Sequence, residues 1–250
     1  MAARSEAPLT LAGLRVLVTR AVEDAPELEA LLRERGAAPV RMPCIAFEDG
    51  PDVARIAAVV RSGRPDLIVV SSPQGAPRLL ALCGPIRVPI AAVGAATARE
   101  LPGDVLVPRQ GVGADALVRE LGGRVAGQRV LTPRAEEGNP ALADGLRAAG
   151  AEVEALVLYR TVTARQVEPA ALRALREGEI DAIAFASGSA ARGFVALAAA
   201  RAAGETAVAC MGRRCAEDAR NAGLRVDAVA DGGLSELCEA VALAVRVRKR

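Results

Sequence analysis

Small polar residues follow several β-rich runs of this 250-residue chain, and they do so twice. Ser71-Ser72-Pro73-Gln74-Gly75 comes after one run, and Ser187-Gly188-Ser189-Ala190 comes after another. Where a strand turns into a helix, unpaired backbone amides point outwards and bind anions. Such turns suit a ligand that carries many carboxylates and is held by backbone donors and a few arginines. The competing interpretation is that each serine is only a helix N-cap.

Other turns of the chain carry residues of the same kind. Gly94 and Thr97 follow a third run and correspond to the region of Gly212, whereas Thr19-Arg20 corresponds to Thr132-Pro133-Arg134. Arginines at these turns would pair with carboxylates, although ordinary surface charge explains each of them equally well. The candidate substrate-binding residues are Thr19, Arg20, Ser71, Ser72, Gln74, Gly94, Thr97, Arg134, Ser187, Gly188, Ser189, Arg192, Gly212 and Arg214.

Tyr159 is the only tyrosine of the chain, and it lies in the long extended segment Glu152–Thr161. A phenol remains a hydrogen-bond donor at neutral pH, so its hydroxyl could donate to a leaving group or to the product. The alternative is a buried ring that only packs against the segment. Tyr159 is therefore the candidate catalytic residue.

The residue types that the chain lacks exclude several kinds of catalytic site. Histidine is absent, which excludes a Ser-His-Asp triad, a Cys-His dyad and the usual zinc sites. The turn Gly94-Ala95-Ala96 lacks the G-x-G-x-x-G spacing, and no G-x-x-x-x-G-K-[ST] phosphate loop occurs. We therefore expect neither a metal nor a nucleotide cofactor.

The composition limits the partners and the compartment. A net charge of +2 with 2% aromatic residues argues against a nucleic-acid-binding surface, and the basic cluster Arg246-Val247-Arg248-Lys249-Arg250 is expected to be a solubilising tail. We expect no membrane span, and Glu6 and Pro8 do not fit a signal peptide. Five cysteines without a C-x-x-C pair are typical of reduced thiols in a cytoplasmic protein.

Three β-rich blocks recur in the same order along the chain. Val16 corresponds to Val130, Asp66 to Asp181 and Gly94 to Gly212, so the offset stays between 114 and 118 residues. This period is far longer than that of solenoid repeats. The repetition therefore predicts two homologous units from an internal duplication. If these units face each other, the strand-to-helix turns of both copies would line one cleft.

Strand-like and helix-like segments alternate through both copies. Continuous Val/Ile/Leu runs without strict alternation are typical of parallel strands covered on both faces. The chain is therefore predicted to form two α/β, doubly wound parallel-sheet (flavodoxin-like) domains. The expected strands are 15–19, 40–47, 66–71, 90–93, 104–107, 129–132, 152–161, 181–186, 207–211 and 226–229. The expected helices include 24–35, 73–82, 95–101, 114–121, 140–149, 189–202, 213–222 and 234–244.

Two long extended stretches, 39–47 and 152–163, follow the same type of helix in the two copies. They could be twin connectors between the domains, in which case the first strand and helix of each copy would lie in the domain of the other copy. Alternatively, a cut near Gly122-Gly123 would separate the copies as contiguous domains. Periodicity alone leaves both arrangements open.

The order of the motifs resembles the uroporphyrinogen-III synthase family over almost the whole chain. The motifs are V-L-V-T-R, S-S-P-Q-G, A-V-G-A-A-T-A, V-L-T-P-R, Y-R-T, F-A-S-G-S-A-A-R-G-F and C-M-G-R-R-C-A-E-D-A-R-N-A-G-L. Tyr159-Arg160-Thr161 is similar to the family's Y-x-T motif, whose tyrosine lies in the cleft. The chain departs from the family at Ala186 and Cys215, where threonine is common, which weakens any need for a hydroxyl there.

The resemblance implies an enzyme that dehydrates and cyclises hydroxymethylbilane, a linear octacarboxylate tetrapyrrole, while inverting ring D without cofactor or metal. It also implies two domains joined by a two-stranded connector, 1–38 plus 164–250 and 39–163. We expect a cytoplasmic monomer with no nucleic-acid or membrane partner and a transient contact with the preceding pathway enzyme. The alternative function is a non-catalytic two-domain binding or regulatory module for an anionic small molecule.

Overall fold

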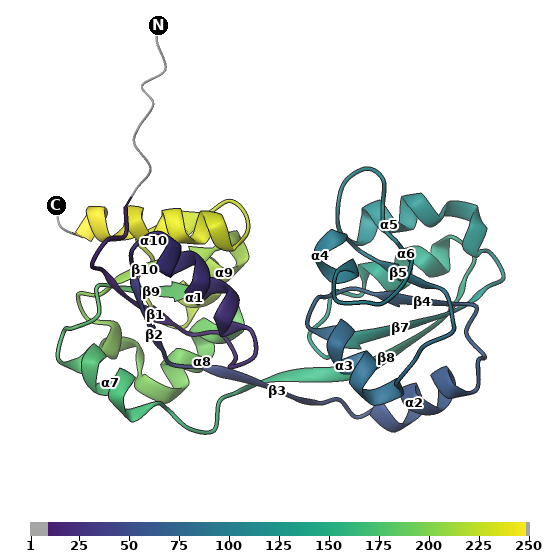
Figure 1. Cartoon of the computed structure of the whole chain (residues 1–250), viewed down its shortest axis with the longest axis horizontal. Helices are drawn as coiled ribbons and strands as arrows, with labels where there is room; N and C mark the ends of the chain where they lie inside the picture. The colour runs from purple at the N-terminus through teal and green to yellow at the C-terminus, as the bar shows by residue number, and fades with distance from the viewer. Residues whose placement is uncertain (1–9, 249–250) are drawn as a thin grey trace, which may run out of the picture. The chain divides into compact units, whose positions relative to one another are not determined.

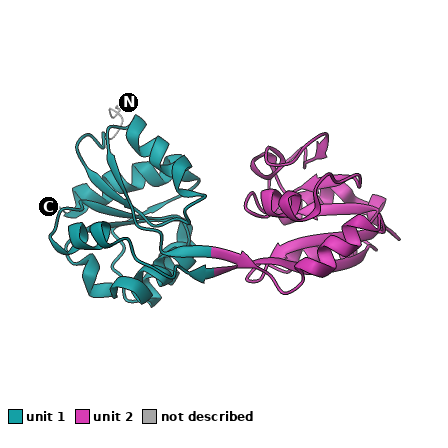
Figure 2. Ribbon diagram, turned by 60° about the horizontal axis from the view of Figure 1, so that its bottom comes forward, with its two compact units in different colours: residues 1–46, 162–250 teal, residues 47–161 magenta. Residues whose placement is uncertain are grey.

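The computed structural model describes residues 10–248, so Glu6, Pro8 and the last two residues of the basic cluster lie outside the described part. The chain divides into two compact units (Figure 2). Unit 1 comprises Met1–Ala46 with Val162–Arg250, and unit 2 comprises Phe47–Thr161. Both ends of the described chain therefore belong to unit 1, and unit 2 is inserted between its two segments.

Unit 1 is built on a five-stranded sheet with the order β11-β10-β9-β1-β2. All the strand pairs of this sheet are parallel. The central strands are almost fully buried, as the unbroken aliphatic runs of the sequence require. The strands are β1 (Arg15–Val18), β2 (Ala38–Arg41), β9 (Ala182–Phe185), β10 (Ala207–Met211) and β11 (Ala228–Ala230).

Helices cover both faces of this sheet (Figure 1). The helices α1 (Ala25–Glu34) and α10 (Leu234–Arg248) pack leucine and valine side chains against β1 and β9. On the other face α8 (Gly188–Ala198) sets Phe194 edge-on to Phe185, with ring centroids 5.6 Å apart. The remaining helices are α7 (Pro169–Arg176), the 3-10 helix η2 (Ala200–Ala203) and α9 (Gly212–Asn221).

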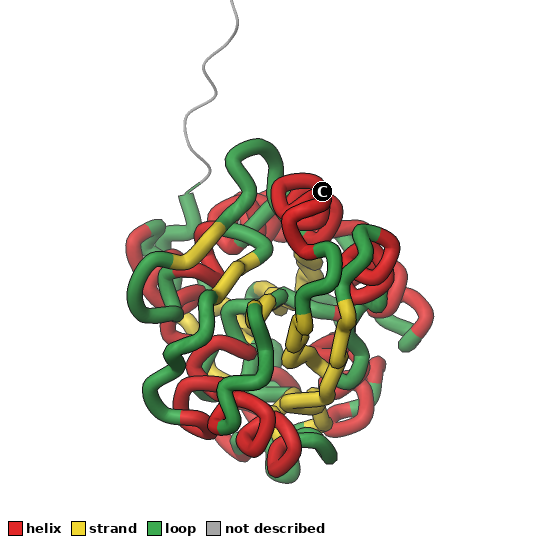
Figure 3. Tube along the Cα trace, turned by 90° about the vertical axis from the view of Figure 1, so that its right-hand side faces the viewer, coloured by secondary structure: helices red, strands yellow, loops and turns green. Residues whose placement is uncertain are grey.

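Unit 2 is built on a six-stranded sheet with the order β3-β8-β7-β4-β5-β6. One apolar core lies under α2 (Val53–Arg61) and α3 (Gly75–Cys83), and a second lies under α5 (Ala114–Leu121) and α6 (Ala141–Ala148). Figure 3 colours the strands of both units yellow, their helices red and their loops green. The other elements are β3 (Ile45–Asp49), β4 (Leu67–Val70), β5 (Ile90–Ala92), α4 (Ala95–Ala98), β6 (Val105–Leu106), η1 (Gly122–Val125), β7 (Arg129–Ala135) and β8 (Glu152–Thr163).

The strand pairs follow the duplication but exchange its halves. β1 of the first copy pairs with β9 of the second copy in the register Val16↔Ala182. In unit 2, β4 of the first copy pairs with β7 of the second copy in the register Leu67↔Val130. These two registers are equivalent under the repeat, so each sheet combines an opening strand from one copy with later strands from the other.

The first extended stretch is not one strand, as 40–47 was predicted to be. β2 pairs with β1 in the sheet of unit 1, and the first segment of unit 1 extends to Ala46. A Cβ at Gly193 of α8 would overlap the carbonyl of Cys44, and this close packing coincides with the break between β2 and β3. The second stretch is the single strand β8, and both β3 and β8 cross the boundary between the units.

Two helices lie outside the helices expected from sequence, α2 and α7. Both are short, at 9 and 8 residues. Their N-cap residues are Asp52 and Glu168, so neither helix begins after the serine or threonine that often marks a helix start. Within the described residues, no helix is long and apolar enough to cross a membrane. The five cysteines are free thiols, four of them buried.

Candidate functional site

The turn after β4 in unit 2 brings a serine and the only tyrosine together. β4 is fully buried and ends at Val70, so the next residues emerge at the edge of the sheet where its strands end, which we call the carboxyl edge. The Gly75 amide at the start of α3 donates a hydrogen bond of 3.1 Å to the Ser72 hydroxyl oxygen. The hydroxyl oxygens of Ser72 and Tyr159 lie 3.0 Å apart in a second hydrogen bond.

The Tyr159 ring reaches this turn from β8 and is only 5% exposed. Phe47 of β3 meets the ring edge-on, with centroids 5.6 Å apart and an interplanar angle of 87°. Aromatic pairs favour this geometry because the positive edge of one ring faces the negative face of the other. The ring is therefore fixed by packing, and its hydroxyl is directed to the turn after β4.

Arg78 of α3 completes the cluster around Tyr159. Its guanidinium carbon lies 4.4 Å from the centroid of Phe47 and 5.3 Å from that of Tyr159. The same guanidinium donates a hydrogen bond of 2.8 Å to the carbonyl oxygen of Gln74. Phe47 and Arg78 were not among the predicted site residues. The only sequence signal for Arg78 is its place one helical turn after Gln74.

The remaining candidates of unit 2 occupy two neighbouring turns. Gly94 precedes α4, which has only 4 residues, and Thr97 within α4 is buried. Arg134 lies near the end of β7, where its guanidinium donates to the carbonyl oxygens of Ala135 and Glu136 at 2.9 Å each. The Glu136 amide in turn donates to the Tyr159 carbonyl, so the end of β7 adjoins the tyrosine on β8.

The turn after β9 in unit 1 corresponds to that after β4 but is built differently. Ser187 is the N-cap of α8, and its hydroxyl accepts a hydrogen bond of 3.2 Å from the Ala190 amide. A Cβ at Gly188 would overlap the carboxylate of Asp218 from α9, so only glycine fits there. Arg192 donates to that carboxylate at 2.8 Å and reaches the Ser189 hydroxyl at 3.5 Å. A carboxylate of the chain itself therefore lies at the N-terminus of α8.

The other candidates of unit 1 lie on either side of this turn. Gly212 opens α9 with a φ of +80°, a conformation that favours glycine, and Arg214 is exposed. Thr19 is fully buried and its hydroxyl donates to the Ala184 carbonyl at 2.9 Å, so it joins two strands. Arg20 is 12% exposed and lies near the carboxylates of Asp24 and Glu27, at 3.8 and 3.5 Å. Both side chains already have partners within unit 1.

Four of the five thiols have a raised pKa, which makes them poor nucleophiles. Burial raises the pKa of the Cys44 thiol to about 12. The hydrogen bond to Cys215 raises the pKa of Cys210 further than burial alone would, and the same bond lowers the pKa of Cys215. Cys215 is buried and its Sγ donates to the Phe185 carbonyl at 3.4 Å, an interaction that a threonine hydroxyl could also make. Within residues 10–248, no group of three or more histidine, cysteine or acidic residues could hold a metal ion.

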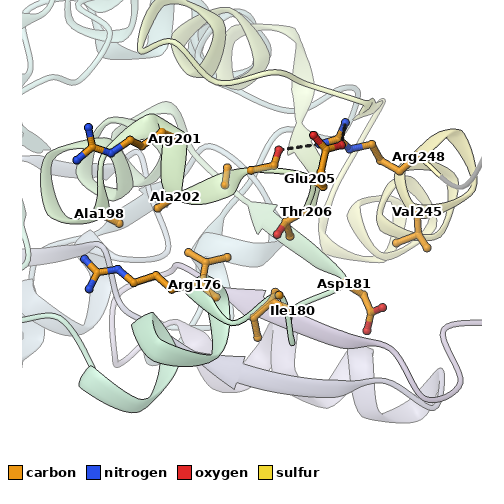
Figure 4. Close-up of a pocket in the computed structure, with 14 residues that line it drawn as sticks. Arg176, Ile180, Asp181, Ala198, Arg201, Ala202, Glu205, Thr206, Val245 and Arg248 are labelled. Atoms are coloured by element: carbon orange, nitrogen blue, oxygen red, sulfur yellow. Dashed lines mark hydrogen bonds and ion pairs between the residues drawn. The ribbon is translucent and has the colours of Figure 1, made fainter.

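A separate hollow of about 700 Å³ lies at the opposite, amino edge of the sheet in unit 1 (Figure 4). It is lined by the ends of α7 and α10 and by the segment before β10, including Arg176, Arg201 and Thr206. Arg248 on its rim is paired with Glu205 at 2.9 Å. None of the predicted site residues lines this hollow, so it is distinct from the turns described above.

The chain is similar to known proteins over most of its length. The family model described as uroporphyrinogen-III synthase HemD matches residues 26–232. The chloroplastic uroporphyrinogen-III synthase of Oryza sativa subsp. japonica is 30% identical over 224 residues, which cover 84% of this chain and 73% of the relative. The uroporphyrinogen-III synthase of Synechococcus elongatus is also 30% identical, over 204 residues, which cover 76% of each chain.

Two solved structures share the fold at lower sequence identity. A uroporphyrinogen III synthase mutant from Thermus thermophilus gives a TM-score of 0.54 at 22% identity, covering 94% of this chain and 99% of the other. The uroporphyrinogen-III synthetase of Helicobacter pylori 26695 gives a TM-score of 0.60 at 15% identity, covering 93% of this chain and 100% of the other. These likenesses support the two-domain α/β fold.

Proposed function

The chain belongs to the uroporphyrinogen-III synthase family, and from this premise we propose how it cyclises and dehydrates hydroxymethylbilane to uroporphyrinogen III. The enzyme is a lyase of tetrapyrrole biosynthesis that works without a cofactor. The observation that carries this function is the family match over residues 26–232, which includes the turn after β4, the turn after β9 and Tyr159.

The substrate explains why so little acid–base machinery is needed. Loss of its hydroxyl is assisted by the electron-rich pyrrole next to the departing group. The protein has to bind an octacarboxylate, bring the reacting end to ring D and keep water away. Catalysis of this kind depends chiefly on positioning. A chain without histidine can therefore perform it.

Tyr159 is the donor that we assign to the departing hydroxyl. Its oxygen lies at the carboxyl edge of unit 2, bonded to Ser72 at 3.0 Å. Either hydroxyl can donate in this bond, because the Ser72 oxygen keeps a second lone pair beside the one that accepts the Gly75 amide, and we assign the donor to Ser72. In that arrangement the phenol can direct its own proton to a ligand. The carboxyl edge is where parallel α/β sheets bind ligands.

The carboxylates of the substrate are assigned to the amide-rich turns of both units. In unit 2 these are the turn of Ser71, Ser72 and Gln74, the turn of Gly94 and Thr97, and Arg134. In unit 1 they are Ser187, Gly188, Ser189 and Arg192, the turn of Gly212 and Arg214, and Arg20 of the opening turn, where the Thr19 hydroxyl is instead bonded to the Ala184 carbonyl. Arg214 offers an exposed guanidinium, whereas Arg192 would exchange Asp218 for a substrate carboxylate.

The cellular setting belongs to the same proposal. Five free thiols suit a reducing compartment, so we assign the protein to the cytoplasm. We propose a monomer that takes its linear substrate in a transient contact with the preceding enzyme, which would limit spontaneous ring closure. Light scattering of the purified chain tests whether it is a monomer. A dimer mass at micromolar concentration would reject it.

Supplying hydroxymethylbilane and resolving the I and III isomers of the product tests the reaction. We expect isomer III in excess over the spontaneous isomer I. Formation of isomer I alone, at the rate without protein, would reject the synthase and favour the alternative of a binding or regulatory module. Calorimetry with the same tetrapyrrole would then distinguish a binding module, which releases heat on binding, from a chain that binds nothing.

A further inference from the structure

Arg78 is held in one place by contacts from three elements of unit 2. Its guanidinium stacks on Phe47 of β3 at 4.4 Å and lies 5.3 Å from the ring of Tyr159 on β8. The Gln74 carbonyl, one turn earlier on α3, accepts a hydrogen bond from the guanidinium at 2.8 Å. Only the planar, delocalised guanidinium can stack on an aromatic face and donate in its own plane at the same time. The position is therefore specific for arginine.

The cluster controls both the place and the electrostatics of the Tyr159 hydroxyl. The ring is packed edge-on against Phe47 and is only 5% exposed, so it has little freedom to turn. Ser72 fixes the hydroxyl itself at 3.0 Å. A permanent positive charge beside the ring stabilises negative charge that develops on the phenol oxygen, and partial burial reduces screening by water.

We propose that Arg78 is a positioning residue that acts through Tyr159 during loss of the substrate hydroxyl. This inference rests on the function proposed above. The carbon–oxygen bond breaks with its electron pair going to oxygen, and the phenol proton passes to that oxygen, so water leaves. The phenolate takes back a proton that the substrate releases when its last ring regains aromaticity. Arg78 favours the phenolate stage and holds the ring still, without touching the substrate.

Turnover measurements in a double-mutant cycle test this role. We expect Arg78→Met to lower kcat about fivefold with KM nearly unchanged, as loss of an ordinary cation–π contact predicts. Arg78→Lys should recover part of kcat, and the control Arg61→Met, on an exposed position of α2, should behave as wild type. In a Tyr159→Phe background, Arg78→Met should cause no further fall. If the falls in kcat of the two single variants multiply in the double variant, or if Arg78→Met raises KM, Arg78 binds the substrate itself.

The spectrum of Tyr159 gives a second and independent readout. The chain has one tyrosine and no tryptophan, so the tyrosine band in near-ultraviolet circular dichroism reports on this residue alone. We expect Arg78→Met and Phe47→Leu each to weaken that band, while Arg61→Met leaves it unchanged. If the wild-type chain forms isomer III and the tyrosine band of Arg78→Met equals that of the wild type, the role of Arg78 is rejected. Absence of isomer III with the wild-type chain would reject the proposed function instead, and with it the effect of Arg78 on turnover.

Discussion

The two units share a carboxylate contact at the amino edge of their sheets, and at the carboxyl edge they differ in the side chains beside two equivalent serines. In unit 2 the Asp66 carboxylate accepts the Arg129 amide at 2.9 Å, which ties the start of β7 to β4. In unit 1 the Asp181 carboxylate accepts the Arg15 amide at 2.8 Å, which ties the start of β1 to β9. The same device therefore sets the same strand register in both copies.

The carboxyl edges carry different chemistry at equivalent turns. The turn after β4 holds a phenol, a serine and a stacked guanidinium. The turn after β9 holds a capping serine and the ion pair of Arg192 with Asp218. Contacts that fix the sheet are common to both copies, whereas groups that can meet a ligand differ. The sequence repeat predicted similar turns in the two units, and the structure gives these turns different side-chain contacts.

The largest expected effect comes from disrupting the close packing of Gly188 against Asp218 in unit 1. Gly188→Ala places a Cβ in the space of the Asp218 carboxylate and separates α8 from α9. We expect the free energy of unfolding to fall by about 1–3 kcal/mol, the usual cost of overpacking. Urea unfolding measures it. Gly123→Ala, at a position with open space, is the control, and Asp218→Ala in the same chain should restore most of the loss. If Gly188→Ala is as stable as the wild type, Gly188 does not pack closely against the Asp218 carboxylate.

The next effect tests the phenol of unit 2. Tyr159→Phe keeps the ring but removes the hydroxyl, and we expect kcat for isomer III to fall about tenfold, as loss of one hydrogen bond predicts. Appreciable activity should remain because backbone donors do most of the holding. Ser187→Ala, at the equivalent turn of unit 1, should lower kcat less. Unchanged ring-closure kinetics in Tyr159→Phe would reject a catalytic role.

A smaller effect tests the carboxylate of unit 1. Asp218→Asn removes a negative charge from the N-terminus of α8 and replaces the ion pair with Arg192 by a neutral contact. We expect KM to fall about two- to threefold, since charge at a helix end contributes about 0.3–1 kcal/mol, with kcat unchanged. Glu217→Gln, on the exposed neighbouring position, is the control. A higher KM would show that Asp218 supports binding rather than competes with it.

The smallest effect concerns the amino edge that the units share. Hydrogen bonds from Arg129 lower the pKa of Asp66 from its ordinary 3.8 to about 2. Because the folded-state pKa is depressed, this pair stabilises the fold above about pH 4, and its contribution is lost as the pH falls through about 2. Solvent screening keeps the contribution small. Urea unfolding at these two pH values measures the free energy of unfolding. Its change with pH should be smaller in Asp66→Asn than in the wild type. An equal change in both proteins would contradict the assigned pair.

The sequence predicted much of this architecture because the relevant signals are local. Buried parallel strands appear in the sequence as aliphatic runs. The repeat that relates Val16 to Val130 marks equivalent strands without any information on their pairing. The turns after these runs could be located for the same reason, since a strand that ends must be followed by residues at its carboxyl edge. Ser72 and Ser187 were placed at these turns in this way, whereas Tyr159 was singled out as the only tyrosine and lies within β8.

Side-chain partners could not be found in that way, because they join residues far apart in the chain. Phe47, Arg78 and Tyr159 meet only after β3, α3 and β8 have packed together. Likewise, nothing local marks Asp218 as the neighbour of Gly188. Whether the Thr19 hydroxyl faces a ligand or the Ala184 carbonyl depends on which strand lies beside it.

The sequence by itself determined two copies of an α/β unit, the strands in each and the turns at their carboxyl edges. Periodicity left the exchange of the first strands open, and the strand pairing decided it. The tertiary structure also decided that 40–47 divides into β2 and β3, and which polar groups have partners. The physical reason is that hydrophobic patterning acts within a segment. Strand exchange, close packing at glycine and charge pairing depend on which distant segments become neighbours.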